Sequence, residues 1–385
     1  MSGIQEKGKL KLSNKMKNDL WEAKPHTLAK ISILRTYLSS WFGIIGSRFQ
    51  NDLWYVDGFA GPGEYTNSPT GSPVAAISAA SDALQRLGTQ WKAGKIHCVY
   101  IEQDSNNFSL LKNKFATSID NPKIQKHFFN LSFVDGLSAL RKQTPNPFEP
   151  PSPLFAFIDP FGAKGVPFSV VKDLLSRKTA EILINLDSDG IGRIFCAGED
   201  ANHEVILNEV FGDNSWKAEL NKHRPSHELY RGVLDLYKQK LRALPNVHYV
   251  FAFEMRSKKN IIDYHLVFAS QHYLGLEKMK EAMKTIDKSG EFCFSDAHLN
   301  QSKMFRFDDP AAYSPQMFEQ FRGRTAKYPE LRDYALNESP FMNPKEMLRD
   351  LERRDMIQVS SSDPNRRKGT FNEDKLINIT FQPGV

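Results

Sequence analysis

Apolar residues along the chain recur first at helical spacing and then in short runs separated by helical stretches. Between Pro25 and Phe49 they return every three or four positions, which predicts an amphipathic helix. Helical stretches over residues 73–87 and 108–115 alternate with apolar runs further along. These runs predict strands over residues 53–56, 96–101, 128–134, 154–158 and 182–186. The alternation predicts an α/β fold with a mostly parallel, Rossmann-like sheet.

Two further apolar runs, His248–Glu254 and Asp263–Ser270, are joined by a short polar turn at Ser257–Asn260. This turn is too short for a helical crossover, so the two strands must run antiparallel. Five β/α units finished by such a hairpin are the layout of class I methyltransferases, whose final strand inserts antiparallel into a parallel sheet. A dinucleotide-binding fold would not require the hairpin.

The alternation stops near residue 271, and helices are expected to dominate to about residue 337. Asn343 can cap a helix that begins at Pro344 and has Glu346 at its third position. A strand, a basic loop and a closing strand follow, which is the order of a winged-helix module. We therefore expect a polar basic arm (1–20), a methyltransferase-like α/β domain (21–270), and a helical extension with a winged-helix-like module (271–385).

The turn after the first predicted strand, Asp57 to Gly63, reads Asp-Gly-Phe-Ala-Gly-Pro-Gly. Glycines let the backbone approach a ligand where a Cβ would clash, and the carboxylate of Asp57 can hold an ammonium group. A dinucleotide site would carry the GxGxxG pattern, which this turn lacks. The turn therefore favours S-adenosylmethionine as the ligand, and a simple tight turn between strand and helix is the alternative.

Acidic residues mark the carboxyl ends of the predicted strands, where open α/β sheets bind their ligands. Asp57, Glu102, Asp159 and Asp187 end four strands, and Asp135 follows the remaining one. For S-adenosylmethionine, Asp57 would face the methionine amino group, Glu102 would accept from the ribose hydroxyls, and Asp135 would lie beside the adenine. A helix N-cap is the alternative for each. The predicted cofactor site comprises Asp57, Gly58, Phe59, Gly61, Gly63, Glu102 and Asp135.

The segment Asp159-Pro160-Phe161-Gly162 lies where the methyl group would be transferred. Methyltransferases of adenine amino groups have Asp-Pro-Pro-aromatic or a close variant there, so that carboxylate and carbonyl hold the amine and the ring stacks on the base. The second proline is missing here, so the motif does not specify adenine. Asp159, Pro160 and Phe161 are the catalytic candidates, and Lys164 is a candidate phosphate contact or a solvated lysine.

Composition and charge restrict the class of protein. Of the 385 residues, 25% are charged and 40% hydrophobic, which is typical of a folded globular protein. The net charge of +6 permits a nucleic-acid partner without requiring one. Three cysteines without CxxC spacing argue against a disulfide framework and a zinc site. With neither a membrane-spanning run nor a signal-peptide core, a cytoplasmic location is expected.

Basic residues cluster at two places outside the predicted sheet. Lysines recur from Lys7 to Lys17 in the N-terminal arm, and Arg366, Arg367 and Lys368 lie together in the loop between the last two strands. Both are candidate phosphate contacts, because exposed lysine and arginine neutralise a nucleic-acid backbone. Solvated surfaces with no partner are the alternative.

These motifs together resemble the three-Cys-motif partner (TcmP) family. The resemblance rests on Asp57 to Gly63, Gly71 to Pro73, Ile101 to Asp104, Asp159 to Gly162 and the stretch Tyr264 to Ala269, and it spans roughly residues 20–380. It implies a methyltransferase-like fold, similar to enzymes that methylate adenine in ribosomal RNA. The family name refers to cysteines in a radical-SAM-like partner protein, so the resemblance also implies that possible partner.

The leading hypothesis from the sequence is an S-adenosylmethionine-dependent methyltransferase-like protein acting on nucleic acid, with the amino group of a base as the favoured target. A second hypothesis is a catalytically inactive methyltransferase-fold partner or regulator of a radical-SAM-like protein. A third is a nucleic-acid-binding protein that transfers no methyl group.

Overall fold

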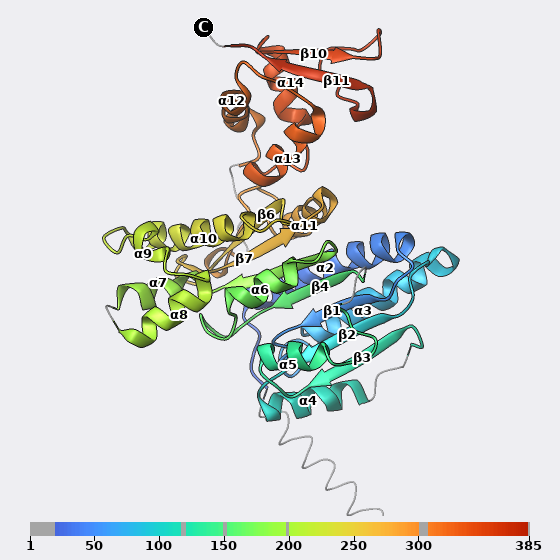
Figure 1. Cartoon of the computed structure of the whole chain (residues 1–385), viewed down its shortest axis with the longest axis vertical. Coiled ribbons are helices and arrows are strands. Elements are labelled where there is room, and N and C mark those ends of the chain that lie inside the picture. Colours follow the sequence, from blue (N-terminus) through green and yellow to red (C-terminus); the bar gives the residue numbers. More distant parts are fainter. Residues whose placement is uncertain (1–19, 117–120, 149–151, 198–199, 300–306, 384–385) are drawn as a thin grey trace, which may run out of the picture.

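The computed structural model describes residues 20–116, 121–148, 152–197, 200–299 and 307–383. Most of the basic arm expected over residues 1–20 lies outside the described residues. The described chain forms a large α/β domain and a smaller module near the C-terminus, at the top of Figure 1. None of the described helices is long and apolar enough to cross a membrane.

The α/β domain is built on one twisted sheet with the strand order β3-β2-β1-β4-β5-β7-β6-β8. Its strands are β1 (Leu53–Asp57), β2 (Ile96–Ile101), β3 (Ile124–Phe129), β4 (Leu154–Ile158), β5 (Ala180–Leu186), β6 (Tyr249–Arg256), β7 (Ile262–Ser270) and β8 (Cys293–Ser295). Strands β1 to β5 are parallel, whereas β7 pairs antiparallel with both β5 and β6. The sequence prediction of a Rossmann-like class I methyltransferase sheet with an antiparallel final hairpin is therefore confirmed.

Two apolar cores cover the two faces of this sheet. Alternate residues of β1 enter opposite cores: Trp54 and Val56 pack in one, Leu53 and Tyr55 in the other. The covering helices are α2 (Pro25–Arg48), α3 (Ser72–Leu87), α4 (Ser105–Ala116) and α11 (Tyr273–Ile286) on one face, and α5 (Phe133–Leu140), α6 (Phe168–Leu175), α7 (Ser188–Cys196), α8 (Ala201–Phe211), α9 (Trp216–Glu219) and α10 (Ser226–Arg242) around the other. The helix expected over residues 25–49 is α2.

The position predicted for the third strand, residues 128–134, is wrong, because β3 covers Ile124–Phe129. Strand β3 ends at Phe129, and α5 begins at Phe133 inside the range expected to be strand. The Ser132 hydroxyl accepts a hydrogen bond from the backbone N–H of Asp135, which caps the helix. The run of apolar residues from Phe128 to Val134 thus joins the end of a strand to the first turn of a helix.

The C-terminal module has its own core and a three-stranded sheet in the order β10-β11-β9. Its elements are α12 (Pro310–Phe321), β9 (Thr325–Ala326), α13 (Tyr328–Glu338), α14 (Lys345–Arg353), β10 (Ile357–Ser361) and β11 (Leu376–Phe381). A short 3₁₀ turn in the module lies at Glu373–Lys375, and two others lie earlier in the chain, at Gly88–Gln90 and Asp296–His298. Helix α14 begins one residue later than expected. Strands β8 and β9 were not foreseen, and β8 places residues beyond the boundary expected at residue 270 in the large sheet.

A buried lysine joins the module to the α/β domain. Lys280 of α11 has no exposed surface, and its Nζ donates to the carbonyl oxygens of Ser339 (2.6 Å), Phe341 (3.1 Å) and Ala335 (3.5 Å) at the end of α13. The side chain of Asn337 continues the contact, because it accepts from the Val250 N–H at 3.0 Å. Helix α13 is thereby fixed to strand β6 and helix α11.

Replacing Lys280 by Met should lower the free energy of unfolding by roughly 2–4 kcal/mol, because three buried carbonyl groups lose their N–H donor. The measurement is urea denaturation followed by circular dichroism. Lys278→Met is the matched control on α11, since Lys278 forms a partly exposed pair with Glu281 and should change stability by no more than about 0.5 kcal/mol. Equal losses in the two variants would contradict this role for Lys280.

Candidate functional site

The loop after β1 forms a tight glycine turn at the carboxyl edge of the sheet. Gly61 and Gly63 have φ angles of +60° and +80°, in the region that favours glycine. No atom lies within 4 Å of the place where a Cβ on Gly61 would be, so the space beside the turn is open. The Gly71 N–H donates to the Gly63 carbonyl at 2.8 Å, which brings the chain back to this turn before α3 begins. The residues between Gly63 and Gly71 therefore loop out from the turn.

Asp57 ends β1 beneath this turn and is completely buried. The Tyr55 hydroxyl donates to its Oδ2 at 3.1 Å, whereas its Oδ1 has no hydrogen-bond partner among the described residues. Burial raises the pKa of Asp57 to about 7, against the opposing effect of nearby hydroxyls, and the charge of Asp159 raises it further. A buried carboxylate oxygen without a partner is costly unless a ligand provides the missing donor.

Glu102 follows β2 and holds the neighbouring turns in place. It is 7% exposed; its Oε2 accepts from the Gly61 N–H at 2.8 Å and its Oε1 from the Asp104 N–H at 2.7 Å. Burial raises the pKa of Glu102, which these backbone donors oppose. Because a carboxylate has about four acceptor positions, two such bonds leave room for the hydroxyls of a ligand.

Asp135 has a local structural role. It lies in the first turn of α5, is exposed, and its Oδ2 accepts from the Ser132 hydroxyl at 2.6 Å. The sequence leaves open a helix N-cap at Asp135, but the N-cap of α5 is Ser132, and Asp135 lies three residues after it and supports that cap. Gly58 and Phe59 lie next to α5, since a Cβ on Gly58 would meet the Phe133 ring at 2.7 Å and the Phe59 and Phe133 rings lie 5.5 Å apart.

Asp159, directly after β4, is held by two side chains from distant parts of the chain. The Lys30 ammonium donates to its Oδ2 at 2.5 Å and the Asn185 amide to its Oδ1 at 2.7 Å. The Lys30 side chain is 8% exposed and Asp159 22% exposed, so the ion pair is largely removed from water. Lys30 is a residue that sequence reasoning missed.

Unpartnered polar atoms gather around Asp159. Among the described residues, the buried Asn185 Oδ1 and Tyr264 hydroxyl have no hydrogen-bond partner. The Lys30 ammonium lies 5.3 Å from the centre of the Tyr264 ring, so Tyr264 belongs to the same cluster. Burial raises the pKa of Tyr264, and the charge of Asp159 adds to that effect. Together with Asp57 Oδ1, these atoms indicate a polar site that a ligand would complete.

Aromatic rings line the outer side of this cluster. Phe161 is 78% exposed and lies edge-on to Trp21, with 6.2 Å between ring centres, and Trp21 lies 6.1 Å from Tyr65. Burial raises the pKa of Tyr65, and the charges of Asp159 and Asp57 add to this effect. A large ring this exposed is unusual and is a candidate contact for a partner.

The basic residues predicted to contact phosphate, Lys164 and Arg366 to Lys368, differ in whether they already have an acidic partner. Lys164 and Arg367 are exposed and form no ion pair within the described residues. Arg366 instead turns inward and pairs with both oxygens of Glu352, at 2.7 and 3.0 Å, while Lys368 pairs with Asp355. Arg366 therefore stabilises the loop itself. These residues belong to the C-terminal module, apart from Lys164, which lies three residues after Phe161.

The described residues contain no group of His, Cys, Asp and Glu side chains arranged to hold a metal ion. Cys98, Cys196 and Cys293 form no disulfide within the described residues, and Cys98 and Cys293 are buried. His265 is also buried and exchanges a 2.8 Å hydrogen bond with the Ser188 hydroxyl. The polar groups that remain for chemistry at this edge are therefore the carboxylates and their partners.

No protein family and no curated protein matches the sequence. Among solved structures, the chain is similar to cofactor-bound Rv0187 from MTB, with 11% identity over 68% of this chain and 89% of that one and a TM-score of 0.35. An O-methyltransferase from Bacillus cereus in complex with SAH shows 12% identity over 70% and 91%, with a TM-score of 0.35. Trm1 from Pyrococcus horikoshii, solved with S-adenosyl-L-methionine, shows 10% identity over 93% and 94%, with a TM-score of 0.35.

Proposed function

We propose that this protein is an S-adenosylmethionine-dependent methyltransferase that acts on an amino group of a nucleic-acid base. The observation that carries the proposal is the set of carboxylates Glu102, Asp57 and Asp159 at the ends of three neighbouring strands, β2, β1 and β4 respectively. Ligands of open α/β sheets bind at this edge. The buried Asp57 Oδ1 without a partner supports a cationic or N–H-bearing ligand there.

The residues present fit the methionine end and the ribose of S-adenosylmethionine. Asp57 Oδ1 would accept from the amino group, and the free acceptor positions of Glu102 would receive the ribose hydroxyls. The open space beside Gly61 would admit the ligand next to the backbone. Asp135 beside the adenine stays a prediction. When bound, the cofactor supplies an electrophilic methyl group.

Asp159 would position the target amine rather than react with it. Its carboxylate is fixed by Lys30 and Asn185, so its remaining acceptor positions keep a constant direction. An amine that donates to Asp159 and to the Pro160 carbonyl has its lone pair directed away from them, toward the methyl donor. Phe161 would stack on the base, as aromatic side chains do in single-stranded nucleic-acid sites.

The C-terminal module is proposed to be winged-helix-like and to hold the nucleic acid. Its order of helix, strand, two helices and two strands supports this. Within the basic loop, Arg367 is the candidate phosphate contact, because Arg366 and Lys368 already have acidic partners. The resemblance to the three-Cys-motif partner family is part of the same proposal.

The test of the proposed function is transfer of tritiated methyl groups from S-adenosylmethionine to separate pools of RNA, DNA and protein. We expect label in a nucleic-acid pool, followed by identification of the modified nucleoside by mass spectrometry. An Asp57→Asn, Glu102→Gln variant is the control and should give no label. Label in protein alone would exclude a nucleic-acid substrate.

The pH dependence of cofactor binding follows from the buried Asp57. Because its pKa is raised to about 7, Asp57 is protonated in the folded protein below that pH, and its protonated form binds an ammonium group poorly. We expect the affinity for S-adenosylmethionine to fall about tenfold from pH 8 to pH 6. The dependence should disappear in Asp57→Asn. Calorimetry in buffers of different ionisation enthalpy measures the proton released on binding; no release at pH 6 would contradict the account.

The raised pKa of Asp57 also determines whether stability rises or falls with pH. A carboxyl whose pKa is higher in the folded state than in the unfolded state binds more protons when folded. Asp57 therefore contributes stability that is fully present below pH 4 and is lost as the pH rises toward and through about 7. Asp57→Asn should remove this contribution to the pH dependence of the free energy of unfolding.

A second candidate function is that of a methyltransferase-fold partner or regulator without activity. The observation that favours it is the Lys30–Asp159 ion pair, because it occupies part of the carboxylate that a target amine would need. This candidate predicts a stable complex with a radical-SAM-like three-Cys-motif protein and no methyl transfer. Co-purification of the two proteins, with transfer measured on the isolated complex, distinguishes the two candidates.

A further inference from the structure

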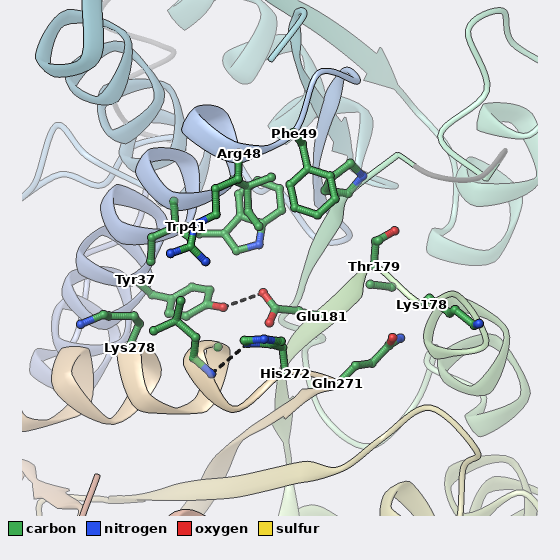
Figure 2. Close-up of a pocket in the computed structure, with 16 residues that line it drawn as sticks. Tyr37, Trp41, Arg48, Phe49, Lys178, Thr179, Glu181, Gln271, His272 and Lys278 are labelled. Carbon is green, nitrogen blue, oxygen red and sulfur yellow. Dashed lines mark hydrogen bonds between the residues drawn. The ribbon is translucent and has the colours of Figure 1, made fainter. Parts of the chain in front are cut away.

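A cavity lies beside the first residues of β5 (Figure 2). Its volume is about 250 Å³, and it lies between α2, the first residues of β5 and the start of α11. Ala180, which lines it, is the first residue of β5, whereas Asn185, near the other end of that strand, contacts Asp159. The cavity is therefore separate from the candidate methyl-transfer site.

One side of this cavity is formed by aromatic rings of α2 and the residue that follows it. Figure 2 shows Trp41 and Tyr37 on one side, with Phe49 at the end of the helix and Glu181 opposite. Tyr37 and Trp41 are only 1% and 4% exposed, so their positions are fixed by packing. Fixed ring faces at the wall of a cavity suit a planar aromatic ligand.

The floor of the cavity carries a carboxylate, Glu181. The Tyr37 hydroxyl donates to its Oε2 at 2.7 Å and the Ser270 hydroxyl to its Oε1 at 2.6 Å. Glu181 forms no ion pair within the described residues, and it keeps part of its surface accessible. A Cβ on Gly275 would lie 2.2 Å from Oε1, so only glycine lets α11 approach this closely. The Trp41 side chain is a third donor to Glu181, and the acceptor position that remains suits a ligand N–H.

The rim of the cavity is positive. Arg48 and Lys178 are exposed and form no ion pair within the part of the chain that the structure describes. Lys278 also lines the cavity but is paired with Glu281 at 2.8 Å. An unpaired guanidinium beside an apolar cavity suits a carboxylate or phosphate group of a ligand.

We propose that this cavity binds a small aromatic anion of one or two rings that carries a ring N–H. The ring would pack against Trp41 and Phe49, the N–H would donate to Glu181, and the anionic group would contact Arg48. The volume of about 250 Å³ lies just below the roughly 300–1,000 Å³ of sites for drug-sized molecules. It therefore limits the ligand to one or two rings.

The probe is indole-3-acetate, titrated into the full chain by calorimetry and observed by saturation-transfer NMR. For a ligand of this size we expect a Kd of about 1 mM or below. Two analogues test the polar contacts: 1-methylindole-3-acetate lacks the N–H, and indole-3-ethanol lacks the charge. Each should bind at least about fivefold more weakly than indole-3-acetate, because each loses one hydrogen-bonded or charged contact.

Arg48→Gln should abolish the preference for indole-3-acetate over indole-3-ethanol. Arg35→Gln is the matched control on the same helix, since Arg35 pairs with Asp82 and does not line the cavity; it should leave the preference unchanged. Glu181→Gln should remove the preference for the N–H. Absence of saturable binding up to about 5 mM, equal binding of the three compounds, or an unchanged preference in Arg48→Gln would each overturn the proposal.

Discussion

Methyl transfer is expected to fall roughly a hundred- to thousandfold when Asp159 is replaced by Asn. The carboxylate receives hydrogen bonds from Lys30 and Asn185, and the proposed amine would be a third donor. The amide has one acceptor oxygen for these three donors, and its own N–H group faces one of them. The target amine would therefore lose its orientation. Single-turnover kinetics with tritiated cofactor measure this loss in the chemical step.

The affinity for S-adenosylmethionine should be retained in Asp159→Asn, since Asp159 is not among the residues proposed to hold the cofactor. Calorimetry with the cofactor alone checks this. Asp173→Asn is a matched control, because Asp173 is exposed and pairs with Arg141, which directly follows α5; its turnover should be unchanged. Full turnover in Asp159→Asn would show that Asp159 does not position the substrate.

The second large effect concerns stability and the Lys30–Asp159 ion pair. Removing one partner of a buried ion pair costs about 3–5 kcal/mol, because the other charge is left without compensation. Asp159→Leu should cost most, since the stranded Lys30 is only 8% exposed, and Lys30→Met should cost less, since Asp159 is 22% exposed and can be rehydrated. The double variant should recover much of the loss. Urea unfolding of the four proteins gives the coupling free energy.

The matched control for this series is Arg35→Met on the same helix. Its ion pair with Asp82 is more than half exposed on both sides, so the change should stay within about 0.5 kcal/mol. If the losses of Lys30→Met and Asp159→Leu simply add in the double variant, then the two side chains do not interact energetically.

The sheet could be predicted from the sequence because its evidence is local. Each strand is a short apolar run bounded by polar residues, and the carboxylates Asp57, Glu102, Asp159 and Asp187 directly follow or end the runs. Parallel order then brings strand ends to one edge without further information. The antiparallel hairpin was equally local, because its turn at Ser257–Asn260 is too short for a crossover.

The partners within the site could not be predicted in the same way. Lys30 meets Asp159 across 129 residues of sequence, and no local pattern specifies that contact. One signal was present: Lys30 shares the buried stripe of α2 with His26, Ile33 and Tyr37, at spacings of three and four. A charged residue in an apolar stripe must find a partner. The pairing of Arg366 with Glu352 similarly depends on how β10 and α14 pack.

Short elements and helix caps were the other source of error. Strands β8 and β9 have three and two residues, too few for a periodic pattern. Asp135 was assigned to a strand end because Phe128 to Val134 is largely apolar, yet Ser132 caps a helix within that run. A capping serine was visible there, but the apolar residues around it indicated a continuous strand.

Calorimetric titration of S-adenosylmethionine into the wild-type protein and the Asp57→Asn, Glu102→Gln variant tests the central claim most directly. The account predicts saturable binding at one site per chain in the wild type and none in the variant, with circular dichroism confirming that the variant is folded. Absence of binding by the wild type, or equal affinity in the two proteins, would contradict the assignment of this sheet edge as the cofactor site.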